Sequence, residues 1–247
     1  KGLDKENWVN FSKSILTTDT KNKTSSKRLN INGEIITITG VAKGSGMIHP
    51  NMATMLSFVA TDIKISKTLL NSIHKKVIDK SYNMITVDGD TSTNDSSILI
   101  STAKSKLSYE KLNDKDKKIF YNGIESLYIE LAKYIIRDGE GATKFISINI
   151  NKIKDKKQGK SIGMSVANSL LVKTALFAED PNWGRILSAI GNSDTSIKDF
   201  SNIEIYLGKI LIFKNNKMYE KYTEKSAAKY LKNKDIEINI VINNGKE

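Results

Sequence analysis

Apolar and polar residues alternate along this chain with two different periods, which predicts a mixture of helices and strands. Trp8, Phe11 and Ile15 recur at helical spacing, whereas the residues around Asn32-Gly33 alternate as in a hairpin. The pattern predicts helices near residues 8–15, 66–77, 124–134, 166–177, 185–190 and 224–231. It predicts strands near residues 31–39, 55–65, 83–87, 96–101, 145–150, 203–213 and 236–242. The run at 55–65 is mostly apolar, so we expect that strand to be buried on both faces.

The order of these elements predicts two domains of the α/β class, in an α+β arrangement. From about Phe145 the pattern restarts as β-α-β-β-α-β, which is typical of a compact α+β unit. We therefore place a first domain at 1–143 and a second, smaller α+β domain at 144–247. The lysine-rich run 152–160 is expected to be an exposed loop.

Composition narrows the possible chemistry. The 247 residues include no cysteine, which excludes disulfides, thiolate nucleophiles and cysteine-ligated zinc. No apolar run approaches the ~20 residues of a membrane span, and the N-terminal segment carries no apolar signal-peptide core. We expect a cytoplasmic protein, or an organellar one in a eukaryote, without a membrane partner.

The net charge of +12 raises the question of nucleic-acid binding. Arginine, the better reader of phosphates and bases, occurs only at positions 28, 137 and 185, which are far apart. We favour a solvated lysine surface and expect no nucleic-acid partner. A basic nucleic-acid-binding module remains the alternative from a different class.

The segment from Lys43 to Asp62 holds the strongest candidate chemistry. A glycine-rich loop leads through Ala53 to Thr54 and then into an apolar strand. A threonine freed at a new N-terminus carries its own general base, the α-amino group, close to Oγ1. If the Ala53–Thr54 bond is cut, Thr54 becomes such a nucleophile.

Two other polar segments are candidate sites. The loop from Asp88 to Asp95 lacks the glycine and late glutamate of a calcium loop, so a polar turn near a site is the better interpretation. His49 and His74 have no ligand spacing, and we predict no metal site. His74 is expected on a helix surface. The turn at 138–144 reads as a helix cap with a solvated carboxylate, or as one that presents a carboxylate to a cationic group.

Taken together, these segments resemble the ornithine acetyltransferase family, the bifunctional glutamate N-acetyltransferase and N-acetylglutamate synthase of arginine biosynthesis. The matching stretches follow the family's order from about Phe11 to near the end of the chain. They are Leu16–Thr20, Lys43–Leu56, Thr61-Asp62, Asn83–Asp95, Arg137–Lys144, Ala167–Ala175 and Glu179–Ile186.

The resemblance implies an αββα sandwich of the self-processing N-terminal-threonine type, with cleavage between Ala53 and Thr54. Thr54 would take the acetyl group from N-acetylornithine as an ester and pass it to glutamate in a ping-pong cycle. By the family pattern Thr17, Lys43, Thr54 and Glu140 bind the substrate. No cofactor is implied, and acetyl-CoA as a further acetyl donor is left open. The two chains of the cleaved precursor are expected to stay associated, as a heterotetramer.

Two departures from the family suggest a fragment. The family's oxyanion-hole Thr-Gly pair lies upstream of the segment matching Phe11–Thr20 and is absent here, and the family's substrate-binding C-terminal tail is also missing. Losing an oxyanion donor costs on the order of 10²–10³ in rate, so we expect little activity from these 247 residues alone. The nearest enzymatic alternative is an N-terminal-nucleophile aminopeptidase or amidohydrolase, which would hydrolyse its acyl-enzyme.

Overall fold

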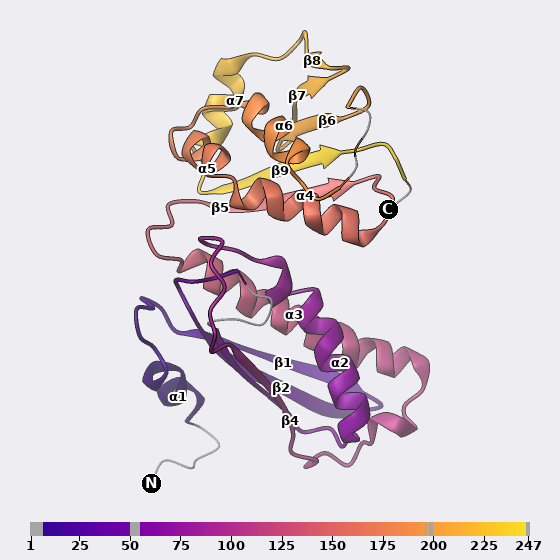
Figure 1. Cartoon of the computed structure of the whole chain (residues 1–247). Coiled ribbons are helices and arrows are strands. Elements are labelled where there is room, and N and C mark those ends of the chain that lie inside the picture. Colours follow the sequence, from indigo (N-terminus) through magenta and orange to yellow (C-terminus); the bar gives the residue numbers. More distant parts are fainter. Residues whose placement is uncertain (1–6, 50–54, 196, 198–199, 246–247) are drawn as a thin grey trace. The chain divides into compact units, whose positions relative to one another are not determined.

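The computed structural model describes residues 7–49, 55–195, 197 and 200–245. The chain divides into two compact units, Lys1–Gly141 and Ala142–Glu247 (Figure 1). The sequence placed the boundary after residue 143, at nearly the same point. Each unit packs helices on its own sheet, which confirms the α+β class.

The N-terminal unit is built on one four-stranded sheet in the order β1-β2-β3-β4. The pairs β1–β2 and β2–β3 are antiparallel, and β3–β4 is parallel. Figure 1 shows the long helix α3 beside this sheet. The elements are α1 (Trp8–Ser14), β1 (Lys23–Ile31), β2 (Glu34–Lys43), β3 (Leu56–Thr61), α2 (Lys67–Asp79), β4 (Ser96–Ser101) and α3 (Asp114–Arg137), with 3₁₀ turns at Tyr82–Met84 and Tyr109–Lys111.

The predicted hairpin is confirmed, and its strands are longer than expected. Asn32 and Gly33 both have positive φ, at 50° and 79°, as a two-residue hairpin turn requires. The polar stretch that precedes Ile31 belongs to β1, because Ser26, Arg28 and Asn30 are exposed on one face of the strand while Ile31 is buried on the other. The strand was not predicted, because its residues are mostly polar and the prediction relied on alternating apolar residues.

Helix α3 covers the sheet and forms the core of the unit with it. Asn113 caps its N-terminus by accepting from the Asp116 amide at 2.9 Å. Its buried side packs Leu127 and Leu131 against β2, where a Cβ on Gly40 would lie 3.0 Å from both leucine side chains. The helix ends at Arg137, next to the predicted stop at Asp138-Gly139.

Two strand predictions in this unit were inaccurate. The segment 83–87 is no strand: it begins with the 3₁₀ turn Tyr82–Met84, and the buried Tyr82 hydroxyl bonds Ser57 Oγ at 2.8 Å. The run 55–65 contains the shorter strand β3, whose residues alternate between buried and half-exposed. Its second face is only partly covered, by the contact of Phe58 with Phe11 of α1.

The C-terminal unit has a separate core and a five-stranded sheet in the order β5-β9-β6-β7-β8. Its elements are β5 (Phe145–Asn151), α4 (Lys156–Asn168), α5 (Leu170–Phe177), α6 (Trp183–Gly191), β6 (Glu204–Leu207), β7 (Ile210–Lys214), β8 (Lys217–Met218), α7 (Glu224–Leu231) and β9 (Asp235–Val241). The single helix expected at 166–177 is two helices, because Ser169 caps α5 by accepting from the Val172 amide.

The lysine-rich run 152–160 was predicted as a loop, and its second half is the first turn of α4. Asp155 caps this helix by accepting from the Gln158 amide at 2.8 Å. The two-residue strand β8 was not predicted. Among the described helices, none is long and apolar enough to cross a membrane.

Candidate active site

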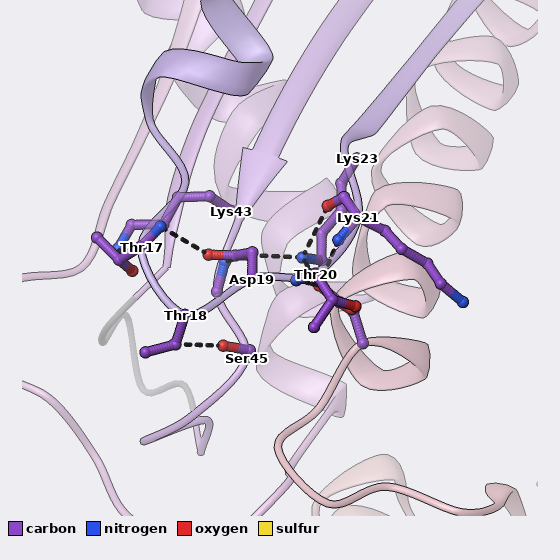
Figure 2. A network of polar contacts seen from close by, with 10 residues as sticks. Thr17, Thr18, Asp19, Thr20, Lys21, Lys23, Lys43 and Ser45 are labelled. Atoms are coloured by element: carbon purple, nitrogen blue, oxygen red, sulfur yellow. Dashed lines mark hydrogen bonds and ion pairs between the residues drawn. The ribbon is translucent and has the colours of Figure 1, made fainter.

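A buried lysine lies at the centre of the polar network in the N-terminal unit. Lys23, the first residue of β1, is 1% exposed. Its Nζ lies 2.5 Å from Asp19 Oδ1 (Figure 2). It also lies 2.6 Å from Asp138 Oδ2, and both carboxylates are buried as well. A buried ammonium is tolerated when it is paired and hydrogen-bonded in this way. One cation therefore joins the turn before β1 to the end of α3.

Both aspartates are held in the charged form. Burial by itself raises the pKa of Asp19, but the hydrogen bond from Lys23, the amide of Gly44 and the Lys23 charge outweigh burial, and the pKa falls below its usual value. Burial also raises the pKa of Asp138, and the hydrogen bonds from Lys23 and Thr20 with the Lys23 charge again bring it below the usual value. The network thus has two anions around one cation at neutral pH.

Asp19 fixes the loop that follows β2. The amide of Gly44 donates to Asp19 Oδ1 at 2.6 Å, and Gly44 has a φ of 143°, in the range that favours glycine. The neighbouring Thr18 hydroxyl bonds the buried Ser45 hydroxyl at 2.7 Å (Figure 2). The turn of Thr17 and Thr18 and the glycine-rich loop are therefore held as one piece.

Asp138 fixes the same turn to the segment that carries Glu140. Its carboxylate accepts from the Thr20 amide at 3.0 Å, from the Thr20 hydroxyl and from the Lys21 amide at 3.3 Å. Two residues later the Glu140 amide donates to the Ser45 carbonyl at 2.8 Å. The turn at 138–144 was expected either to be a cap with a solvated carboxylate or to present a carboxylate to a cationic group. Asp138 is the C-cap of α3, and its carboxylate is buried and paired with Lys23.

The Glu140 carboxylate lies directly over Gly46. A Cβ built on Gly46 would be 2.9 Å from Glu140 Cδ and Oε1, closer than real Cβ atoms come. Glycine at this position therefore leaves the space that the carboxylate occupies. Glu140 itself is exposed, so its charge faces solvent and a ligand can reach it.

The structure brings three of the predicted substrate residues to this network. Lys43 Nζ donates to Thr17 Oγ1 at 3.3 Å. Glu140 is joined to the same region through its amide, which donates to the Ser45 carbonyl. Ala53 and Thr54 lie outside the described residues. The strand register pairs Lys43 with Leu56, so the described chain resumes beside the lysine. A cation, a hydroxyl and a carboxylate are thus presented together, which suits an amino-acid ligand.

Sequence reasoning did not find Asp19, Lys23 or Asp138 as a charged cluster. Asp19 belongs to a matched motif, but no signal in the sequence shows that Lys23 is buried between carboxylates distant in the chain. Asp95 was part of the matched stretch 83–95 but was not singled out. It is the last residue of the 88–95 loop, and burial raises its pKa to about 7 against the opposing effects of the Met55 amide and the Lys43 charge.

The remainder of that polar loop has a structural role. The Asp88 carboxylate accepts from the amides of Met47 at 2.6 Å and Ile48 at 3.0 Å, which ties the loop to the glycine-rich segment. Within the described ranges, no group of three or more His, Asp or Glu side chains is placed to hold a metal ion. His74 is half-buried on α2 and not fully exposed: its Nε2 lies 2.9 Å from Ser97 Oγ, and burial lowers its pKa.

The chain resembles known proteins over nearly its whole length. The profile of the ArgJ family matches residues 2–247. The arginine biosynthesis bifunctional protein ArgJ of Methylococcus capsulatus (strain ATCC 33009 / NCIMB 11132 / Bath) is 40% identical over 243 residues, which cover 98% of this chain and 60% of that protein. The protein of the same name from Colwellia psychrerythraea (strain 34H / ATCC BAA-681) is 41% identical over 251 residues, covering 99% of this chain and 59% of that protein.

A solved structure shows the same fold. The crystal structure of arginine biosynthesis bifunctional protein argJ from Bacillus halodurans superposes with a TM-score of 0.72 at 34% identity, covering 78% of this chain and 90% of that one. The chain spans about 60% of the length of the curated relatives it matches. On the family profile, the relatives and the fold together, the chain belongs to the ArgJ family.

Proposed function

We propose that this chain carries the acetyl-transfer site of an arginine-biosynthesis enzyme. Thr54 is the nucleophile once the bond after Ala53 is cut, and it passes an acetyl group from N-acetylornithine to glutamate. The observation that best supports this proposal is the convergence of Thr17, Lys43 and Glu140 on one hydrogen-bonded network, at the end of β2 that pairs with the start of β3.

The proposed reaction has two half-reactions that share one ester. Thr54 Oγ1 attacks the acetyl carbonyl carbon of N-acetylornithine, and the α-amino group of Thr54 takes the hydroxyl proton. The same group returns that proton to the departing nitrogen, so ornithine leaves as an amine. The amine of glutamate then attacks the ester carbonyl, a proton returns to Oγ1, and N-acetylglutamate leaves.

Charge explains how the site recognises its substrates. The Lys43 ammonium suits the α-carboxylate that both substrates carry. The Glu140 carboxylate suits the side-chain ammonium of ornithine, which glutamate lacks. Glu140 therefore favours the acetyl donor over the acceptor, and we expect Glu140→Gln to raise KM for N-acetylornithine more than KM for glutamate.

Intact mass of the purified full-length protein tests the nucleophile. The wild type should give two pieces, the second beginning at Thr54, whereas Thr54→Ala should stay whole and inactive. A wild-type protein that transfers acetyl groups as one uncut chain would contradict the mechanism. Thr54→Ser, which keeps a hydroxyl, serves as the conservative control and should retain cleavage.

Substrate omission distinguishes a transferase from a hydrolase. Turnover of N-acetylornithine should require glutamate, and a hydrolase would be indifferent to it. Replacing N-acetylornithine by acetyl-CoA tests whether a second donor is used. Native mass of the cleaved protein tests the proposed heterotetramer.

Two lysine substitutions, one inside the proposed substrate site and one outside it, test the site itself. Lys43→Met should raise KM for both substrates, because both lose the partner of their carboxylate. Lys75→Met on the exposed side of α2 removes the same charge elsewhere and should leave KM unchanged. Equal effects of the two variants would indicate a general charge effect and would count against the assignment.

A further inference from the structure

The carboxylate of Asp19 joins two residues of the proposed substrate site, Thr17 and Lys43, through the backbone beside them. The Asp19 side chain is fully buried, and its Oδ1 accepts from the Gly44 amide at 2.6 Å. Its Oδ2 accepts from the Thr17 amide at 3.4 Å (Figure 2). Gly44 directly follows Lys43 in the chain, so one carboxylate fixes the backbone at both residues.

Lys23 holds this carboxylate in place. Its Nζ lies 2.5 Å from the same Oδ1 that accepts from Gly44, and it is also paired with the buried carboxylate of Asp138. Hydrogen bonds to a charged acceptor are stronger than those to a neutral one, and three donors on one carboxylate restrict its rotation. The Thr17 and Gly44 amides are therefore bound to an acceptor that is itself fixed by a buried ion pair.

The two side chains placed in this way form a site that suits a carboxylate. Lys43 Nζ donates to Thr17 Oγ1 at 3.3 Å. This bond uses one of the three ammonium N–H groups and a lone pair of the hydroxyl, so both side chains keep donors for a ligand. Thr17 is exposed and Lys43 is half-buried, so a ligand can reach them. A carboxylate accepts from two neighbouring donors at once, one on each oxygen.

We propose that Asp19 is a positioning residue of the substrate site, which sets the places of Thr17 and Lys43 and thereby the affinity for the α-carboxylate that both substrates carry. This inference rests on the proposed function. Because Asp19 is buried, it acts on the substrates only through these two residues. Its loss should weaken the binding of both substrates equally, whereas the loss of Glu140 should weaken mainly that of N-acetylornithine.

Asp19→Asn in the full-length protein tests the inference. Asparagine has one acceptor oxygen, and its NH₂ group is a donor, so the Thr17 amide or the Gly44 amide loses its partner. We expect KM for N-acetylornithine and KM for glutamate to rise together by about tenfold, a size typical of one hydrogen bond to a charged group. kcat should change much less than KM, because the α-carboxylate is bound alike in the ground state and the transition state.

Combining this substitution with Lys43→Met separates positioning from a purely structural role. Once the lysine is absent there is no ammonium to place, so the effect of Asp19→Asn on KM should shrink to about twofold. The fall in melting temperature that Asp19→Asn causes should be similar with and without Lys43, because stability depends on the pairing with Lys23. Effects on KM that multiply in full would show that Asp19 acts independently of Lys43.

Asp62→Asn is the matched control, because the Asp62 carboxylate also accepts from a backbone amide of β2, that of Thr37, at 3.0 Å. Thr37 lies in the opposite half of that strand from Lys43. The control should leave KM for both substrates at the wild-type value. Asp19→Glu is a second test variant: it keeps the charge beside Lys23 but is longer by one methylene, so it should still misplace Gly44 and raise both KM values.

The outcomes separate the two proposals. Unchanged KM in Asp19→Asn, while the wild type transfers acetyl groups, overturns the role of Asp19 and leaves the proposed function standing. A rise in KM for one substrate only, or an equal rise in Asp62→Asn, overturns it too. If Asp19→Asn yields no active protein, Asp19→Glu decides: raised KM for both substrates supports the role, and wild-type KM or no activity overturns it. A wild-type protein that transfers no acetyl groups removes the proposed function, and this inference with it.

Discussion

At the scale of single residues, Lys23 is the side chain whose loss the N-terminal unit should tolerate least. Lys23→Met would leave Asp19 and Asp138 buried without their cation. Breaking a buried pair in this way costs about 3–5 kcal/mol, measurable by urea unfolding at neutral pH. Lys80→Met, which removes the exposed partner of Glu125, should cost about 1 kcal/mol or less. Equal losses would show that Lys23 is no more important than a surface lysine.

The stability lost in Lys23→Met should also depend on pH. In the wild type the pKa values of Asp19 and Asp138 lie below the usual 3.8, so their contribution to stability is present above that pH and is lost as pH falls through the lowered values. Without the Lys23 cation, burial raises the pKa values of Asp19 and Asp138. Protonating these aspartates then restores part of the stability that the variant has lost. The deficit of Lys23→Met should therefore shrink as pH falls below about 4. A deficit that is constant with pH would contradict the ion-pair account.

Gly46 is expected to affect binding more than stability. A Cβ at this position meets the end of the flexible Glu140 side chain, which can swing away. Gly46→Ala should therefore raise KM for N-acetylornithine while changing the melting temperature little. Gly163→Ala, where the added Cβ makes only an ordinary contact of 3.7 Å, is the matched control. Unchanged KM in Gly46→Ala would count against Glu140 as a binding residue.

The residues of the candidate site were predictable to different degrees. Motif matching identified Thr17, Lys43 and Glu140, and the structure places them around one network. Lys23 escaped because its role depends on burial and on two aspartates that lie outside its strand. From sequence alone, charged residues are expected on the surface, and only the fold shows which of them are buried.

At the scale of elements, close contact of α3 with the hairpin depends on glycines. A Cβ on Gly123 would lie 2.5 Å from Leu29 Cδ1 of β1, so Gly123→Ala should force the helix or the leucine to move. We expect a loss of about 1–3 kcal/mol, despite the better helix propensity of alanine. Adding Leu29→Ala should recover part of the loss by removing the clash.

The exposed Asn122 of the same helix provides the control. Asn122→Ala adds no contact with the sheet and should be neutral or slightly stabilising by propensity. Denaturant unfolding of the single and double variants measures each effect. If Leu29→Ala made the Gly123→Ala loss larger, the steric account would be wrong.

Elements with strong local signals could be predicted, and those fixed by tertiary contacts could not. The Asn32-Gly33 turn and the apolar stripe of α3 are determined by residues close together in the sequence. Strand β1 reads as a polar linker because only its partner β2 makes it a strand. The segment 83–87 reads as a strand, yet the bond of Tyr82 to Ser57 holds its start in a 3₁₀ turn.

At the scale of the molecule, the two units have separate cores. The C-terminal unit encloses its own cluster, in which Ile205 and Ile238 are fully buried. We expect residues 142–247 to fold alone, giving a cooperative thermal transition and dispersed amide resonances. Ile238→Asp puts a charge at the centre of the sheet and should abolish both. A non-cooperative 142–247 fragment would show that the unit depends on the rest of the chain.

The pairing of β2 with β3 has a consequence for the cut protein. The proposed cleavage point lies between these strands, which are hydrogen-bonded neighbours from Ile38–Thr61 to Lys43–Leu56. The two products would share one sheet and one core, so cutting turns unimolecular unfolding into dissociation governed by mass action. The unfolding midpoint of the cleaved wild type should rise with protein concentration, and that of the uncut Thr54→Ala protein should rise less or not at all. Dilution, harmless to the precursor, becomes a denaturing condition for the mature enzyme.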